Sequence, residues 1–142
     1  MKSGFPDIMN PWIFYDLLDS RRTRNLIRDW LDSIPAKASA KIDARILYMR
    51  TMRSWPPQFV SAFTGWPEIY ELRVVSAGSQ YRPIFFYGPG RGEVTLVHGA
   101  IEKGKLMRRE LDYADGNRKI AQADRRRITE HVFRFGAGAG KP

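Results

Sequence analysis

The chain has 142 residues, a formal net charge of +9 and a pI of about 10.2. Its residues are 43% hydrophobic and 13% aromatic, which excludes a disordered chain, and the lack of cysteine excludes disulfides and thiolate metal sites. No signal peptide and no run of about 20 apolar residues is found, so we expect a soluble, cytoplasmic protein without membrane contact. The basic charge favours a polyanionic partner, either nucleic acid or the ribosome.

The first half of the chain predicts one strand, two helices and a loop. Residues 11–18 form an aromatic, β-branched stretch after a proline, which is typical of a strand. Apolar residues recur at helical spacing over 25–34, and a second helix is predicted over 36–52, where alanine and long side chains dominate. Paired prolines and a Gly-Trp-Pro sequence predict an irregular loop over 54–67.

The second half predicts three strands and a long helix. Residues 68–76 alternate between apolar and polar, with Tyr70 and Leu72 on one face and Glu71 and Arg73 on the other. The sequence AGSQ predicts a turn, YRPIFFYG a second strand, GPGRG another turn and EVTLVHGA a third strand. A helix is then expected from about residue 108 through the sequence ITEHVF, with a possible break at a glycine.

This β-α-α-β-β-β-α order predicts an α+β fold. We expect an antiparallel sheet of about four strands, with the N-terminal helical pair packed on one face and a C-terminal helix. The whole chain, 1–142, is interpreted as a single domain with flexible ends at 1–10 and 135–142.

Cationic residues recur on the predicted strands. Arg73 lies within one strand, Arg82 begins the next, and Lys103 and Lys105 follow the last. A surface salt bridge to Glu71 is the simpler explanation for Arg73. Tyrosines are interleaved with these cations, and arginine forks beside aromatic planes are typical of single-stranded RNA recognition.

The remaining motifs predict less chemistry. His98 and His131 are 33 residues apart without a recognisable carboxylate cluster, so no metal site is expected. His98 is either a structural histidine or a proton-transfer group. GPGRG joins two predicted strands, which favours a hairpin turn over a phosphate loop. The three arginines of 125–127 are either a solvated helix face or a ridge that contacts phosphates.

Several segments together resemble the RelE/HigB-like toxins of type II toxin–antitoxin pairs, in particular their phage-derived HigB-type branch. The segments are IYELR (69–73), YR (81–82), EVTLVHGAIEKGK (93–105) and RELDYADGNRK (109–119). The resemblance implies a small basic RNase that enters the ribosome, cuts mRNA without a metal or other cofactor, and is silenced by a helix-turn-helix antitoxin. It assigns catalysis to Arg73, Arg82 and Lys103. The candidate RNA-binding residues are Lys105, Tyr81, Tyr87, His98 and Arg118.

In such a reaction, the neighbouring 2′-hydroxyl attacks the phosphate while arginines stabilise the developing charge. The base is left open among Lys103, Tyr81, Tyr87 and His98. Two other interpretations also remain open. One is a non-catalytic basic module that binds RNA or protein, and the other is an unrelated basic α+β protein such as a virion or assembly component.

Overall fold

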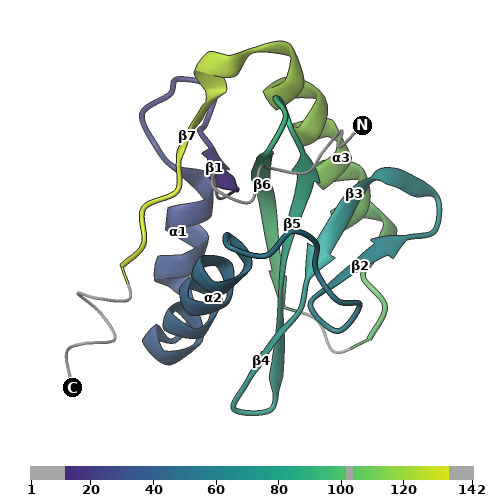
Figure 1. Cartoon of the computed structure of the whole chain (residues 1–142). Coiled ribbons are helices and arrows are strands. Elements are labelled where there is room, and N and C mark those ends of the chain that lie inside the picture. The colour runs from purple at the N-terminus through teal and green to yellow at the C-terminus, as the bar shows by residue number, and fades with distance from the viewer. Residues whose placement is uncertain (1–11, 102–103, 135–142) are drawn as a thin grey trace.

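The computed structural model describes residues 12–101 and 104–134. The predicted flexible ends, 1–10 and 135–142, and Lys103 therefore lie outside the described residues. The elements in chain order are β1 (Ile13–Leu17), α1 (Leu26–Ser33), α2 (Ala36–Met49), β2 (Val60–Phe63), β3 (Trp66–Leu72), β4 (Val74–Ser76), β5 (Ser79–Tyr87), β6 (Glu93–Ile101), α3 (Arg108–Ala123), a 3₁₀ turn η1 (Arg125–Arg127) and β7 (Ile128–Glu130) (Figure 1).

The described strands form a seven-stranded mixed sheet rather than an antiparallel sheet of about four. Its order is β2-β3-β5-β6-β1-β7, and β4 pairs with β5 beside β3. β1 runs parallel to β6 and antiparallel to β7. The α+β class is correct, the predicted strand number was wrong, and the antiparallel prediction fails only at the parallel β1–β6 pair. The alternation within a strand does not reveal which neighbour it will meet.

Two of the additional strands lie where the sequence predicted other structure. β2 lies inside the predicted 54–67 loop, where it forms a short outer strand against β3. Gly65, at φ +94°, makes the tight turn between them. β7 lies inside the predicted C-terminal helix, because α3 ends at Ala123 and Asp124 then accepts a hydrogen bond from the backbone N–H of Arg126. Gly116 does not break α3.

The third additional strand arises from a break at Arg73. This residue lies between β3 and β4 rather than within a strand, and its N–H donates to the carbonyl of Phe59. β3 and β4 both pair with β5, so they follow one edge of the same strand. Arg73 therefore lies at the break between two strands that pair with the same edge of β5.

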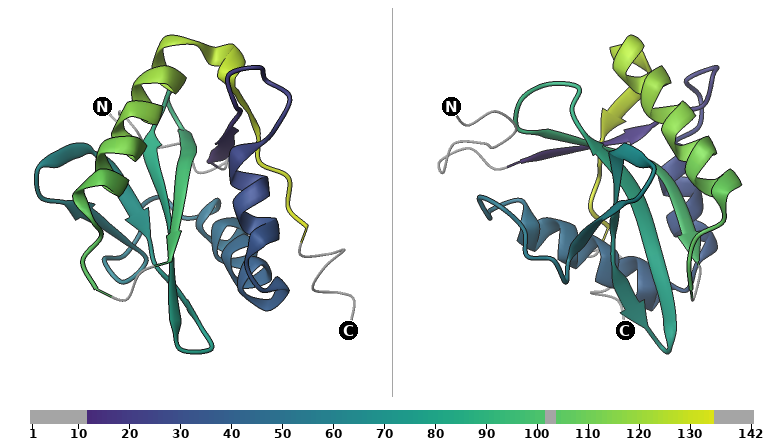
Figure 2. Two further views of the ribbon diagram at one scale, coloured as in Figure 1. Left: turned by 180° about the vertical axis from the view of Figure 1, so that it is seen from behind. Right: turned by 90° about the vertical axis from the view of Figure 1, so that its right-hand side faces the viewer.

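Helices cover both faces of the sheet. α1 and α2 enclose one core with β-strand residues that include Leu72 and Val74. α3 encloses a second core, which contains Ile69 and Ile84. Seen from the side, α2 and α3 lie on opposite sides of the strands (Figure 2). The predicted helical pair on one face and the predicted faces of Leu72 and Val74 are confirmed.

A buried ionic network fixes the C-terminal segment to the first core. The imidazole of His131 lies 2.8 Å from Asp16 through Nδ1 and 2.8 Å from Asp43 through Nε2. Asp16 also accepts from Asn25, and Asp43 accepts from the backbone of Arg134. Burial alone would lower the pKa of His131, but the two carboxylates raise it to about 9. The expectation that no carboxylates accompany this histidine was wrong, because they lie far from it in the sequence.

Candidate functional site

Glu71 on β3 lies between Arg73 and Arg82, two of the predicted catalytic residues. Its Oε1 is 3.5 Å from Nε of Arg82, and its Oε2 is 3.3 Å from Nε of Arg73. Ser61 on β2 donates a hydrogen bond of 2.8 Å to Oε2. The ion pair expected between Glu71 and Arg73 is therefore present, and it extends to the second arginine.

The two arginines differ in how far their side chains are buried and in how many protein contacts they make. The side chain of Arg73 is 49% exposed, whereas that of Arg82 is 9% exposed and also donates to Gln80. Oε1 of Glu71 and Nε of Arg82 are buried, and neither has a hydrogen-bond partner within normal geometry. Buried charged atoms without hydrogen bonds lower the stability of the fold. A role in fold stability therefore does not explain the Glu71–Arg82 pair well.

A cavity of about 600 Å³ opens beside this group on the α3 side of the sheet. Four cationic side chains and one carboxylate line it: Arg73, Arg82, Lys105, Arg108 and Glu71. Its apolar wall includes Phe63, Trp66 and Leu111. We name this space the arginine cavity. It has the charge to hold a phosphate and an aromatic wall beside that charge.

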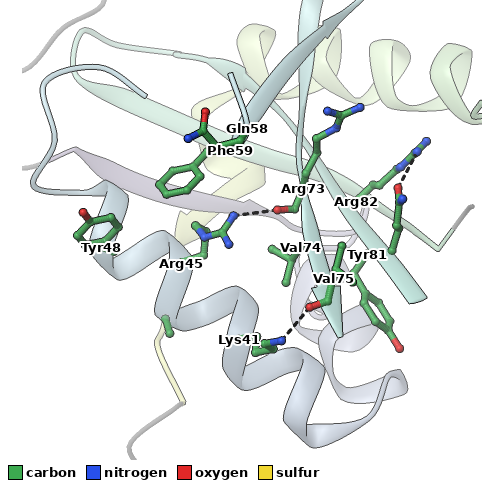
Figure 3. Close-up of a pocket in the computed structure, with 12 residues that line it drawn as sticks. Lys41, Arg45, Tyr48, Gln58, Phe59, Arg73, Val74, Val75, Tyr81 and Arg82 are labelled. Atoms are coloured by element: carbon green, nitrogen blue, oxygen red, sulfur yellow. Dashed lines mark hydrogen bonds between the residues drawn. The ribbon is translucent and has the colours of Figure 1, made fainter. Parts of the chain in front are cut away.

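A second cavity, of about 750 Å³, lies on the α2 side and shares both arginines (Figure 3). Here Lys41 donates to the carbonyl of Val75, and Arg45 donates to the carbonyl of Arg73. These contacts hold α2 against β4. In Figure 3 the guanidinium groups of Arg73 and Arg82 point away from Lys41 and Arg45. We therefore locate the candidate site in the arginine cavity.

The two predicted tyrosines do not face this cavity. Tyr81 is 6% exposed and belongs to the core under α1 and α2. Tyr87 lies on the same face at the far end of β5, about 16 Å along the strand from Arg82. Its ring stacks on Trp55, and burial raises its pKa to about 12, with Tyr70 adding to the rise.

His98 and Arg118 lie on the α3 side but outside the described cavity lining. His98 lies diagonally across from Arg82 on β6, because Ala100 is the direct partner of Arg82. Its Nε2 is 2.5 Å from Glu110. Arg118, well along α3, pairs with Asp115 at 2.8 Å. The structure therefore brings Arg73, Arg82 and Lys105 together without Tyr81, Tyr87 and Arg118.

Sequence reasoning missed several components of the site. Arg108 lines the cavity because α3 begins there, and Trp66 lines it because residues 60–63 and 66–72 form a hairpin. Glu71 was seen as a surface partner of one arginine, although it is 5% exposed and contacts both. The alternation on β3 placed Glu71 and Arg73 on one face, but no local pattern indicated that Arg82 would join them.

Two further observations on the described residues concern metal-binding groups and membrane-spanning helices. Within 12–101 and 104–134, no three histidine, aspartate or glutamate side chains form a group that could hold a metal ion. In the same residues, no helix is both long and apolar enough to cross a membrane.

Comparison with known families adds an independent observation. The model of the family described as phage derived protein Gp49-like (DUF891) matches residues 29–119, more than half of the chain. The chain belongs to this Gp49-like family. No significant match is found among curated proteins or among solved structures. The Gp49-like region contains every described residue of the arginine cavity, whereas β1, η1 and β7 lie outside it.

Proposed function

We propose that this Gp49-like protein is the toxin of a type II toxin–antitoxin pair and acts as a ribosome-dependent, metal-independent endoribonuclease on mRNA. The proposal is supported by the resemblance of its strand and loop sequences to RelE/HigB-like toxins. Membership of a phage-derived family is consistent with it. The arginine cavity also supports the proposal, because four cationic side chains line it.

The observation that carries the proposal is the arrangement of Arg73 and Arg82 around Glu71 at the arginine cavity. A phosphodiester in this cavity would meet preorganised cations, which act where negative charge develops. Glu71 fixes the orientation of both arginines, so less rotamer freedom is lost when RNA binds. Trp66 and Phe63 offer apolar surface to an unstacked base.

In the proposed reaction the 2′-oxygen attacks the neighbouring phosphorus while its proton passes to a base. The bond from phosphorus to the 5′-oxygen breaks, that oxygen takes up a proton, and the products are a 2′,3′-cyclic phosphate and a 5′-hydroxyl. In this proposal Arg73 and Arg82 stabilise the phosphoryl oxygens, and Lys105, which lines the cavity, protonates the leaving oxygen. Glu71 and Lys103 are the candidate proton acceptors.

The test is expression of single variants without an antitoxin. Arg73→Ala and Arg82→Ala are each expected to slow mRNA cleavage about 10²–10³-fold, because each removes a preorganised donor. The readouts are growth and the mapping of mRNA 5′ ends after induction. Arg109→Ala is the matched control, since Arg109 is an exposed α3 arginine that does not line the cavity.

Folding must be separated from chemistry for the buried arginine. The double variant Glu71→Gln/Arg82→Gln removes both charges together and keeps similar volumes, so it serves beside Arg82→Ala. Circular dichroism establishes that each variant is folded. If folded variants of both arginines still arrest growth and yield the same mRNA ends as the unsubstituted chain, the proposed assignment is wrong.

We also propose a helix-turn-helix antitoxin as the protein partner, with the arginine cavity as the surface that it masks. A small helix-turn-helix protein encoded beside this chain is expected to restore growth when both are expressed. Failure of such a neighbour to bind the purified chain contradicts this part of the proposal.

A non-catalytic RNA- or protein-binding module remains the second candidate. The close approach of Glu71 to Arg82 favours it, because a neutralised arginine stabilises the negative charge that develops during cleavage less strongly, while the other cations of the surface can still bind RNA. This candidate predicts that the purified chain binds mRNA and ribosomes while the mapped mRNA ends stay unchanged.

A further inference from the structure

A second cluster of cations lies at the opposite end of α3 from the arginine cavity. It consists of two segments, the loop 19–24 after β1 and the turn 124–127 after α3, which we name the arginine end. Their six arginines are Arg21, Arg22, Arg24, Arg125, Arg126 and Arg127. Figure 1 shows the loop after β1 beside the end of α3 at the top of the molecule.

Hydrogen bonds join these two segments, although about a hundred residues separate them. The N–H of Leu18 donates to the carbonyl of Arg127 at 2.7 Å, and the Arg127 guanidinium donates back to the carbonyl of Leu18 at 3.2 Å. β1 pairs with β7 directly beyond this point. The charge of Arg22 also reaches Asp124, whose pKa is lowered first by its hydrogen bonds with Arg126 and in part by Arg22. The two segments that carry the six arginines therefore lie side by side.

The carboxylates of the two segments hold the backbone in shape. Asp19 accepts from the N–H groups of Thr23 and Arg24, and Asp124 accepts from the N–H of Arg126. Two more carboxylates reach the segments from neighbouring elements, since Asp29 pairs with Arg24 and Glu93 pairs with Arg125, each at 2.7 Å. Six arginines against these four carboxylates leave a net charge of two on the arginine end. Arg21 and Arg22 are exposed and form no ion pair with any described residue.

The backbone at Arg22 supports a role in binding. Its φ is +59°, in the left-handed region where glycine and asparagine are favoured and an arginine costs about 1 kcal/mol. Its side chain forms no hydrogen bond or ion pair with a described residue, and only the longer-range attraction to Asp124 acts against this cost. A long cationic side chain at such a position is better explained by an external anion than by the fold.

The chemistry of the surface favours phosphates on a nucleic-acid backbone. All six cations are arginines, whose planar forks bind phosphate through two parallel hydrogen bonds. The two segments contain no aromatic residue on which an unpaired base could stack. None of the exposed large hydrophobic side chains lies on them, so the apolar centre of a typical protein interface is absent there.

We propose that the arginine end docks the chain on the phosphate backbone of double-helical RNA, separately from the arginine cavity. α3 spans 16 residues and sets the two surfaces about 24 Å apart. One surface can therefore hold a structured RNA while the other holds a single strand. Both segments lie outside residues 29–119, so this site is not part of the region matched by the Gp49-like model. The inference goes beyond mRNA cleavage and does not depend on it.

The test measures binding of the full chain to a labelled RNA duplex of about 16 base pairs by fluorescence anisotropy, over a range of salt concentrations. Arg21→Ala/Arg22→Gly is expected to weaken binding about tenfold and to reduce the slope of log K against log salt by about 2. Arg22→Gly also relieves the left-handed backbone, so thermal stability should not fall. The matched control, Lys37→Ala/Arg53→Ala, removes two exposed cations elsewhere and should leave the slope nearly unchanged.

Three results would overturn the inference. They are unchanged duplex binding by the arginine-end variant, an equal loss in the control variant, or displacement of the duplex by polyglutamate at equal charge concentration. The last result would indicate an acidic protein partner. Arg82→Ala should keep full duplex binding, so failure of the proposed cleavage and failure of this docking site give different results.

Discussion

Two buried charged groups lie on opposite faces of the same sheet, and they are built differently. Around His131 on the α1–α2 face, both ring nitrogens and both carboxylates are hydrogen-bonded, and the side chains are at most 2% exposed. Around Glu71 on the α3 face, one carboxylate oxygen and Nε of Arg82 face each other at 3.5 Å without a hydrogen bond, and a cavity lies beside them.

The difference separates a structural group from a functional one. A fully paired network holds distant segments together, and removing one member leaves the others buried and charged. A partly satisfied group next to a cavity can improve its contacts when a ligand arrives. The contrast predicts that the first group affects mainly stability and that the second affects mainly activity.

The largest expected effect is on stability at the first group. His131→Ala leaves Asp16 and Asp43 buried without their shared partner, so it should lower the free energy of unfolding by about 3–5 kcal/mol. Urea denaturation followed by circular dichroism measures this change. A loss below 1 kcal/mol would mean that the network does not hold the C-terminal segment in place.

The same network predicts a pH dependence. Burial alone would lower the pKa of His131, but Asp16 and Asp43 raise it from 6.5 to about 9. Because the folded pKa is raised, this stabilisation is complete below pH 6.5 and disappears as the pH rises through 9. It amounts to about 3 kcal/mol. Unfolding of the native chain at pH 6 and pH 9.5 should show the loss, and a His131→Ala chain should show much less of it.

At the second group, single and double variants should diverge. Arg82→Ala leaves Glu71 buried beside one remaining arginine and should cost about 1–3 kcal/mol. Glu71→Gln/Arg82→Gln should stay within about 1 kcal/mol of the native chain, because it removes two opposite buried charges together. mRNA cleavage should be lost in both. If the double variant is as unstable as His131→Ala, the two groups have the same structural role.

The smallest effect is expected at the other histidine. His98 and Glu110 have side chains 20% and 31% exposed, so His98→Ala should lower stability by less than about 1 kcal/mol. Cleavage should fall only slightly, because His98 does not line the described arginine cavity. A large loss of cleavage without loss of stability would instead make His98 a proton-transfer group.

Local sequence patterns predicted where helices and strands form more completely than they predicted which strands pair with one another. Helical spacing located α1 and α2, and alternation placed Leu72 and Val74 on the helical face. The predicted loop at 54–67 is correct over residues 54–59 but wrong at β2, which is a strand only through its pairing with β3. The predicted C-terminal helix begins at Arg108 as expected but ends at Ala123, and its predicted continuation was wrong because β7 is stabilised by β1, more than a hundred residues earlier.

The candidate site likewise depends partly on local sequence and partly on long-range packing. The sequence by itself determined the basic charge, the closeness of Arg73 and Arg82 to neighbouring strands, and a lysine after the strand that became β6. These depend on composition and on the two-residue period of a strand, which are local properties. Only the tertiary structure decided that Glu71 lies between the arginines, that Arg108 joins them, and that Tyr81 and Tyr87 face the opposite core. Such contacts depend on strand register and on the face that each helix covers, and both are set by packing between segments far apart in the chain.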